Sequence, residues 1–136
     1  MALIIMIKEP VFKTYDQNQP YLIPPNWNEK IDQDHPVRIV NKIIDSIDLK
    51  NLYRSYKGGG TSSYDPSMLL KAIIYGYINN IYSSRKIEEA IKSNIYFIWL
   101  CGRNEPDHNT INRFRSEKIE LYLKDIFKQI VLLLSE

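Results

Sequence analysis

The segment EPDHNTINRFRSEK, at residues 105–118, holds the densest group of side chains that could carry chemistry or bind a ligand. Asp107 directly follows a proline and stands where a helix N-cap is expected. After it come imidazole, carboxamide and guanidinium groups, on His108, Asn109, Asn112, Arg113 and Arg115. These residue types allow three interpretations: a metal or catalytic cluster, a solvated helix face, or the end of a helix that contacts DNA.

The residue types argue against a metal or catalytic cluster. Zinc needs three or four ligands, and Asp107 and His108 have no second histidine or cysteine beside them. The other histidine, His35, precedes a proline at the start of a predicted helix, where a capping role is expected. Cys101 lies in an apolar, aromatic stretch and is predicted to be a core thiol. The acidic residues are scattered over predicted helix surfaces and do not suggest a two-metal carboxylate site. We therefore expect no metal site, no cofactor and no catalytic residue.

DNA recognition fits the segment better. A predicted helix over residues 83–92, a connector and a helix that opens with polar and basic side chains form a helix-turn-helix-like unit. In such units the first residues of the second helix contact base edges, where Asn suits adenine and Arg suits guanine. The residues predicted to contact DNA begin the two helices: Ser83, Ser84, Arg85, Lys86, His108, Asn109, Asn112, Arg113 and Arg115.

These residues are expected to contact different parts of the DNA. Asn109, Asn112 and Arg113 would face bases or the adjacent backbone, and Arg115 and the residues that begin the first helix would hold phosphates. His108 is expected to steady the turn rather than read a base. A merely solvated helix face is the alternative, because such a face can have the same composition.

Length and composition set the wider limits. The chain has 136 residues, enough for one domain with a hydrophobic core, and 44% of them are hydrophobic and 25% charged. The net charge of +2 gives no chain-wide basic field, so a nucleic-acid surface has to be local. The single cysteine excludes an intramolecular disulfide. The apolar runs ALIIMI and VLLLS are too short to span a membrane, and no signal peptide is evident, so we expect a cytoplasmic protein.

Helical periodicity from residue 34 onward predicts an all-α, compact multi-helix domain over residues 34–136, because no stretch alternates long enough for a strand. Asp34 is predicted to cap the first helix. The helix at residues 66–80 has Asp65 as its N-cap and is apolar around nearly its whole circumference, so it should be the buried centre of the domain.

Shorter elements follow this helix. Asn94 should cap a helix that ends at Gly102, which is predicted to be left-handed. Ile111 and Phe114 should face the core. After residue 116 the apolar phase slips by one, which predicts a kink or a break at residues 116–118. The last helix then carries an apolar stripe: Ile119, Leu123, Ile126, Phe127, Ile130, Leu133 and Leu134.

Residues 8–33 differ in composition from the rest of the chain, because they are rich in Pro, Asn, Gln and Asp. Residues 1–33 are predicted to form an extended arm packed on the domain. Tyr21, Leu22, Ile23 and Trp27 would anchor it, and a partly disordered leader is the alternative. The segment KGGGTSS, at residues 57–63, should be a loop without the features of a phosphate-binding loop.

Six segments in order, DHPVRIV, SIDLKNLY, YDPSMLLKAIIYGY, SSRKIEEA, FIWLCG and PDHNTINRFR, resemble the N-terminal domain of bacterial insertion-sequence transposases of the DDE class, the InsH-like group. The resemblance runs from about residue 12 to the end. It implies binding of double-stranded DNA, at the terminal inverted repeats of the element, ahead of a ribonuclease-H-like catalytic domain. No residue here matches a catalytic position of that family, and the chain ends at Glu136 before the catalytic strands. The isolated chain, a separate domain or a truncated reading frame, is therefore expected not to cleave or join DNA.

An interaction module is the second functional interpretation. The apolar stripe of Ile119–Leu134 could pair two protomers as a homodimer or dock on the catalytic domain. A near-neutral net charge fits this interpretation better than strong DNA binding does. A salt titration distinguishes the DNA-binding interpretation from the interaction-module interpretation, because DNA affinity falls steeply with salt concentration and apolar pairing does not.

Overall fold

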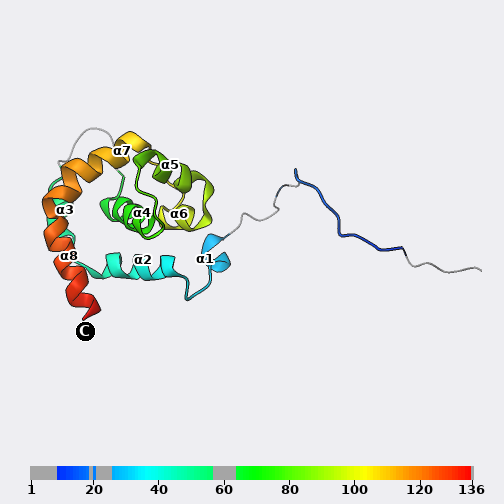
Figure 1. The fold of residues 1–136 in the computed structure, drawn as a ribbon, viewed down its shortest axis with the longest axis horizontal. Coiled ribbons are helices and arrows are strands. Elements are labelled where there is room, and N and C mark those ends of the chain that lie inside the picture. Colours follow the sequence, from blue (N-terminus) through cyan, green and yellow to red (C-terminus); the bar gives the residue numbers. More distant parts are fainter. Residues whose placement is uncertain (1–8, 19, 21–25, 57–63, 136) are drawn as a thin grey trace, which may run out of the picture.

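Helix α4 (Pro66–Ile78) lies at the centre of the helical body, in a computed structural model that describes residues 9–18, 20, 26–56 and 64–135 (Figure 1). Around it, in chain order, lie α1 (Trp27–Lys30), α2 (Pro36–Ser46), α3 (Lys50–Arg54), α5 (Ser84–Ser93), α6 (Ile95–Leu100), α7 (His108–Arg113), a π-helical turn (Phe114–Ile119) and α8 (Glu120–Leu134). The described residues contain no strand, which confirms the all-α prediction. None of the described helices is long and apolar enough to cross a membrane.

The burial of α4 confirms its predicted central place. Its Asp65 cap accepts a hydrogen bond from the backbone N–H of Ser67 at 2.8 Å, and the Tyr53 hydroxyl donates to the same oxygen at 2.6 Å. Most of its length is then buried: Pro66, Met68, Leu69, Leu70, Ala72, Ile73, Tyr75 and Gly76. α2, α5 and α6 cover it. Only its last turn, with Tyr77 and Ile78, is exposed.

A glycine in α4 allows the chain to turn tightly into α5. A Cβ atom on Gly76 would stand 3.0 Å from the carbonyl oxygen of Ile81 and 3.4 Å from Cγ1 of Ile87. The backbone N–H of Ile81 donates to the Gly76 carbonyl at 2.8 Å, which holds the two segments at this separation. The close contact offsets the low helix propensity of glycine.

The start of α2 corrects one prediction. The N-cap is His35, not Asp34, and its Nδ1 accepts a hydrogen bond from the backbone N–H of Val37 at 3.1 Å. The His35 ring also stacks on Tyr96 with 3.9 Å between ring centroids. This stacking fixes the imidazole over the helix end, so the cap falls one residue later than predicted.

The arm is described only in part. Residues 9–18 are exposed and extend away from the helical body (Figure 1). Residues 27–30, predicted to be extended, form α1 instead, because Asn26 caps them by accepting from the backbone N–H of Asn28 at 3.0 Å. Trp27 is half-buried. The anchors predicted at residues 21–23 lie outside the described residues, so the packing of the whole arm stays a prediction.

Arg38 fastens the segment after α1 to the body. Its Nη2 donates to the carbonyls of Asn28 and Ile31 at 2.6 and 2.8 Å, and its Nε donates to that of Asp32 at 2.9 Å. The guanidinium also lies 5.1 Å from the centroid of the Trp99 ring. One side chain of α2 thus joins α1 and α6.

The chain from α7 to α8 runs without a break. The phase slip predicted near residues 116–118 is absorbed by the π-helical turn, which inserts an additional residue into the helical repeat. Ile111, Phe114, Ile119 and Ile126 are consequently all buried. The predicted core-facing positions of Ile111 and Phe114 are therefore confirmed.

Polar contacts hold α8 against its own chain. Gln129 donates from Nε2 to the carbonyl of Asp48 at 2.8 Å and accepts from the Asp48 backbone N–H at 2.7 Å. In the π-helical turn just before α8, Lys118 donates from Nζ to the carbonyl of Ser55 at 3.0 Å and lies 4.4 Å from the centroid of the Tyr56 ring. α8 is therefore held beside the connection from α2 through α3.

Candidate nucleic-acid interface

Helices α5, α6 and α7 form one packed unit, in which α5 contacts both of the others. α5 is amphipathic: Ile87, Ala90 and Ile91 are buried and its charged residues point outward. Ile111 of α7 is buried on the same side. The polar side chains at the starts of α5 and α7 are thereby placed at the surface.

Side-chain caps define where α5 and α7 begin. The Ser83 hydroxyl accepts a hydrogen bond from the backbone N–H of Lys86 at 3.1 Å. The Asp107 carboxylate accepts from the backbone N–H of Thr110 at 2.8 Å, and this bond lowers the pKa of Asp107. Both caps confirm the predicted helix starts. The hydroxyl proton of Ser83 is left available for an acceptor outside the helix.

A carboxylate of α5 holds the first residue of α7. Glu88 Oε1 accepts a hydrogen bond from the backbone N–H of His108 at 2.8 Å and lies 3.3 Å from Nδ1 of the same residue. Lys92 lies 3.8 Å from the other Glu88 oxygen. The backbone bond from His108 is the main reason that the pKa of Glu88 is lowered. This geometry supports the expected role of His108 in steadying the turn.

Two contacts give the relative direction of α5 and α7. Glu88 reaches His108, whereas Arg115 donates from Nη1 to the carbonyl of Tyr82 at 2.7 Å. The two helices therefore run antiparallel, and the start of α5 lies beside the end of α7. The candidate residues of both helices are thus brought onto neighbouring surface.

The side chains best placed for DNA are exposed and without partners. They come from α5 and α7, and none forms a side-chain hydrogen bond or ion pair with another described residue: Arg85, Lys86, Asn109, Asn112 and Arg113. Exposed cations and carboxamides without internal partners can pair with phosphates or base edges at little cost in lost contacts.

Arg115 is oriented differently. Besides its bond to Tyr82, its guanidinium lies 5.4 Å from the centroid of the Tyr77 ring. Its Nε and Nη2 atoms are buried and face no hydrogen-bond acceptor among the described residues. In this orientation the side chain holds the turn from α4 to α5, and its predicted phosphate contact stays a prediction. Sequence reasoning missed this brace and the Glu88 contact, because each joins residues far apart in the chain.

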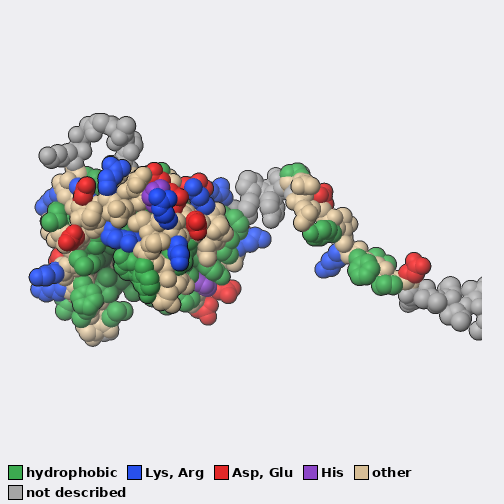
Figure 2. Space-filling view, turned by 45° about the horizontal axis from the view of Figure 1, so that its top comes forward, with side chains coloured by type: hydrophobic (Ala, Val, Ile, Leu, Met, Phe, Trp, Pro, Cys, Tyr) green, Lys and Arg blue, Asp and Glu red, His purple; other side chains and the backbone are tan. Residues whose placement is uncertain are grey.

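The charge of this surface is mixed. Residues 83–115 contain six basic and four acidic side chains. Figure 2 shows basic and acidic groups interspersed over the upper part of the body, where α5 and α7 lie. Glu88 is engaged by His108 and Lys92, which reduces its effect on an approaching phosphate. The surface is therefore weakly basic rather than strongly so.

An apolar groove lies between α4 and α8 and adjoins the candidate DNA surface at Asn112. Its volume is about 610 Å³. The groove is lined by Leu70, Ile73, Ile74, Tyr77, Asn112, Arg115, Ser116, Ile119, Glu120, Leu123, Ile126, Phe127 and Ile130. Figure 2 shows hydrophobic side chains on both sides of a hollow beside the C-terminal helix.

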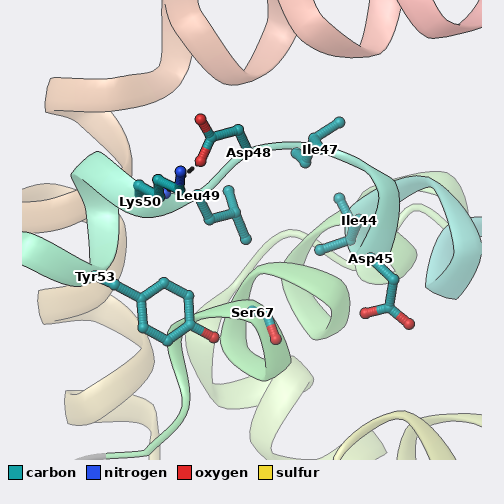
Figure 3. Close-up of a pocket in the computed structure, with 8 residues that line it drawn as sticks. All are labelled: Ile44, Asp45, Ile47, Asp48, Leu49, Lys50, Tyr53 and Ser67. Carbon is teal, nitrogen blue, oxygen red and sulfur yellow. Dashed lines mark hydrogen bonds between the residues drawn. The ribbon is translucent and has the colours of Figure 1, made fainter.

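A second, shallower hollow of about 350 Å³ lies where α2, α3 and α4 meet (Figure 3). Its polar groups already have partners in the fold. Asp48 accepts from the backbone N–H of Lys50 at 2.9 Å, Asp45 pairs with Lys71 at 2.7 Å, and Tyr53 donates to Asp65. No three His, Cys, Asp or Glu side chains of the described ranges cluster closely enough to hold a metal ion. This hollow is therefore best explained by helix packing.

The comparisons with known proteins identify a family. The family described as "Transposase domain (DUF772)" matches residues 25–117. No curated protein and no solved structure shows significant similarity to the chain. The matched residues include α1 to α7, with the candidate residues of α5 and α7, and leave α8 outside. Because the match covers more than half of its length, the chain belongs to the DUF772 transposase domain family.

Proposed function

We propose that this domain binds double-stranded DNA during transposition, at the terminal inverted repeats of its element. The observation that carries the proposal is the surface of α5 and α7. Five basic or carboxamide side chains there form no side-chain hydrogen bond or ion pair with the described residues, and two side-chain caps and the Glu88–His108 contact hold their helices in place. Because the chain belongs to a transposase family, DNA is the ligand that we expect this surface to bind.

The proposed roles follow from exposure and position. Asn109, Asn112 and Arg113, on the first turns of α7, contact base edges or the adjacent backbone. Arg85 and Lys86, with Ser83 and Ser84, hold phosphates. His108 keeps α7 on α5. Arg115 supports this surface indirectly, because its hydrogen bond to Tyr82 holds the turn before α5.

The placement within a transposase is also part of the proposal. The chain acts in the cytoplasm as the N-terminal module of a DDE-type insertion-sequence transposase of the InsH-like group. Strand cleavage belongs to a ribonuclease-H-like domain of the complete enzyme, and this chain contributes binding rather than catalysis. The family match and the helix-turn-helix-like arrangement of α5 to α7 support this placement.

A titration with the DNA ends that flank the gene tests the proposal. Affinity for these ends should exceed that for a scrambled duplex, and the logarithm of the binding constant should fall linearly with that of the salt concentration, by about 0.9 per neutralised phosphate. If the wild type and a folded Asn112→Ala, Arg113→Ala double variant bound DNA equally, these residues would be part of a solvated helix face that does not contact DNA.

A second function is favoured by a separate observation on α8. Leu121, Leu123, Phe127, Val131, Leu132 and Leu134 are exposed on this one helix. So much exposed apolar surface is typical of a protein-interaction site. We propose that α8 makes this domain an interaction module as well. An association that persists at salt concentrations that abolish DNA binding would support this function.

A further inference from the structure

We propose that Tyr82, in the turn from α4 to α5, stacks on an unpaired base of the DNA that α5 and α7 bind. The inference rests on the first function proposed above and names the class of DNA, a duplex that continues into an unpaired strand. It starts from two neighbouring rings at the surface. Tyr77 is 42% exposed and Tyr82 is 56% exposed, and their ring centroids lie 5.6 Å apart.

Both rings are held in place by contacts within the fold. The Tyr82 hydroxyl donates a hydrogen bond to Oδ1 of Asn80 at 2.9 Å, and the Tyr82 carbonyl accepts one from Nη1 of Arg115 at 2.7 Å. The Arg115 guanidinium also lies 5.4 Å from the centroid of the Tyr77 ring. Asn80 has a φ of 61°, a left-handed conformation that turns the chain between the two tyrosines. A ring that is fixed before binding loses little conformational freedom when a base stacks on it.

The buried part of Arg115 indicates that this arrangement has a use beyond stability. Its Nε and Nη2 atoms are buried and have no hydrogen-bond acceptor among the described residues. Donors that are shielded from water without an acceptor lower the stability of a fold. The turn that Arg115 holds nevertheless leaves Tyr77, Ile78 and Tyr82 exposed. Because exposed side chains add little to the core, their fixed arrangement points to a contact outside the chain.

The rings lie next to the proposed phosphate contacts. Tyr82 directly precedes Ser83, whose hydroxyl caps α5, and Arg85 and Lys86 lie on the first turn of that helix. Residues 66–87 contain no acidic side chain, so this part of the chain carries no charge that repels a phosphate. A nucleotide whose phosphate is held at the start of α5 therefore has its base close to Tyr82.

The chemistry of the rings favours an unpaired base over a paired one. In a duplex each base is covered on both faces by its neighbours, and only its edges are open to hydrogen bonds in the grooves. The Tyr82 hydroxyl already donates its proton to Asn80, so what the side chain offers is mainly the face of its ring. Aromatic faces bind the faces of unstacked bases, with little preference for sequence. A protein partner is the other class of ligand for exposed tyrosines, but the adjacent cations favour a nucleic acid.

The test compares three DNA duplexes that share the paired bases of the element end. One is blunt, one carries a single unpaired thymine, and one carries an abasic nucleotide in place of that thymine, on either strand. The thymine and abasic duplexes have the same phosphates, so the difference in affinity between them reports the base alone. The wild type should bind the thymine duplex about tenfold more tightly than the abasic duplex on one of the two strands.

Substitutions of Tyr82 assign the contact. Tyr82→Leu keeps an apolar side chain and should abolish the difference between the thymine and abasic duplexes. Tyr82→Phe keeps the ring and should retain this difference. The matched control is Tyr64→Leu, because Tyr64 is 36% exposed and lies at the opposite end of α4. The control should bind all three duplexes like the wild type, and melting curves compare the folding of all variants.

A fluorescent base gives a readout that does not depend on affinity. An adenine analogue whose emission is quenched by stacking takes the place of the unpaired thymine. Saturating amounts of the wild type or of Tyr82→Phe should quench this emission, and saturating Tyr82→Leu should not. The wild-type signal alone decides the question if a variant fails to fold, since no quenching by the wild type overturns the inference.

The outcomes separate the inference from the function on which it rests. A wild type that binds none of the duplexes overturns both. Equal binding of the thymine and abasic duplexes by the wild type, with a steep salt dependence, overturns the inference and leaves DNA binding in place. A folded Tyr82→Leu that binds all three duplexes like the wild type also overturns it. If this variant loses affinity equally for all three, Tyr82 contacts the paired region, and the unpaired base is again excluded.

Discussion

The carboxylate of Glu88 accepts a hydrogen bond from the backbone N–H of His108 at 2.8 Å, so a residue of α5 satisfies the first backbone donor of α7. Asp107 satisfies another, at Thr110. An unpaired backbone donor at a helix start costs free energy when it is shielded from water. Glu88 thereby joins the two helices that carry the candidate DNA surface, although it contacts no DNA in the proposal.

We expect Glu88→Gln to lower the melting temperature at neutral pH, because glutamine keeps an acceptor but loses the charge. The lowered pKa of Glu88 gives the sign of the pH dependence. A carboxyl group whose pKa is lowered by folding contributes stability above its ordinary value of 4.5, and the contribution is lost as the pH falls through the folded-state value. The difference between wild type and variant should therefore shrink in acid.

Thermal melts from neutral pH down to below the ordinary glutamate pKa provide the measurement. Glu89→Gln is the matched control, because the Glu89 side chain is exposed and forms no hydrogen bond or ion pair with the described residues. A gap between wild type and Glu88→Gln that stays constant over this range would contradict the assigned pKa shift.

Burial of α4 predicts a position-dependent response to charge. Leu70→Asp should abolish the cooperative melt, because an unpaired carboxylate would be buried in the core. Leu70→Ala should cost about 2–5 kcal/mol in the free energy of unfolding. Ile78→Asp, in the exposed last turn of the same helix, should change it by only about 0.5 kcal/mol. Denaturant titration of the three variants measures these differences, and similar losses at residues 70 and 78 would refute the central position of α4.

Cys101 offers a direct test of core integrity. It is buried, and this burial raises the pKa of its thiol to about 12, so almost no thiolate exists at neutral pH. A thiol reagent should modify the native chain slowly, at a rate limited by opening of the fold, and should react at once in denaturant. Ser93→Cys, at an exposed position, should add one fast equivalent. Rapid labelling of the unmutated native chain would be inconsistent with a buried Cys101.

The features that the sequence predicted correctly are local. Asp65, Asn94 and Asp107 cap helices because each stands a few residues from the backbone donor that it accepts from. Gly102 has a φ of 54°, as predicted for a left-handed residue at a helix end. Such contacts depend on nearby residues alone, so spacing and residue type are sufficient to predict them.

Features that depend on distant partners could not be read in this way. A capping role was expected for both Asp34 and His35, and the structure has His35 as the cap, with its ring stacked on Tyr96, which lies far away in the sequence. Arg115 bonds to Tyr82 across 33 positions, so its side chain turns to the α4–α5 turn rather than outward. The phase slip after residue 116 was visible, but a kink, a break and a π-helical turn produce the same slip, and only packing selects among them.

The last prediction concerns the two classes of DNA contact. Arg113, on α7, is proposed to contact a base, and Lys86, on α5, a phosphate. Arg113→Ala should cost about 1–3 kcal/mol on the preferred duplex and relax the preference at one base position. Lys86→Ala should weaken binding to all sequences alike and reduce the salt slope by about one phosphate.

Binding curves on a set of single-base variants of the element ends, at several salt concentrations, distinguish these effects. Both side chains are exposed and form no hydrogen bond or ion pair with the described residues, so both variants should melt much like the wild type, and a change in affinity can be assigned to the contact itself. Arg115→Ala is the informative contrast: it removes the contact with Tyr82 and should lower the melting temperature together with the affinity. If Arg113→Ala reduced affinity equally for every duplex, Arg113 would bind the DNA backbone, and base readout would rest on Asn109 and Asn112.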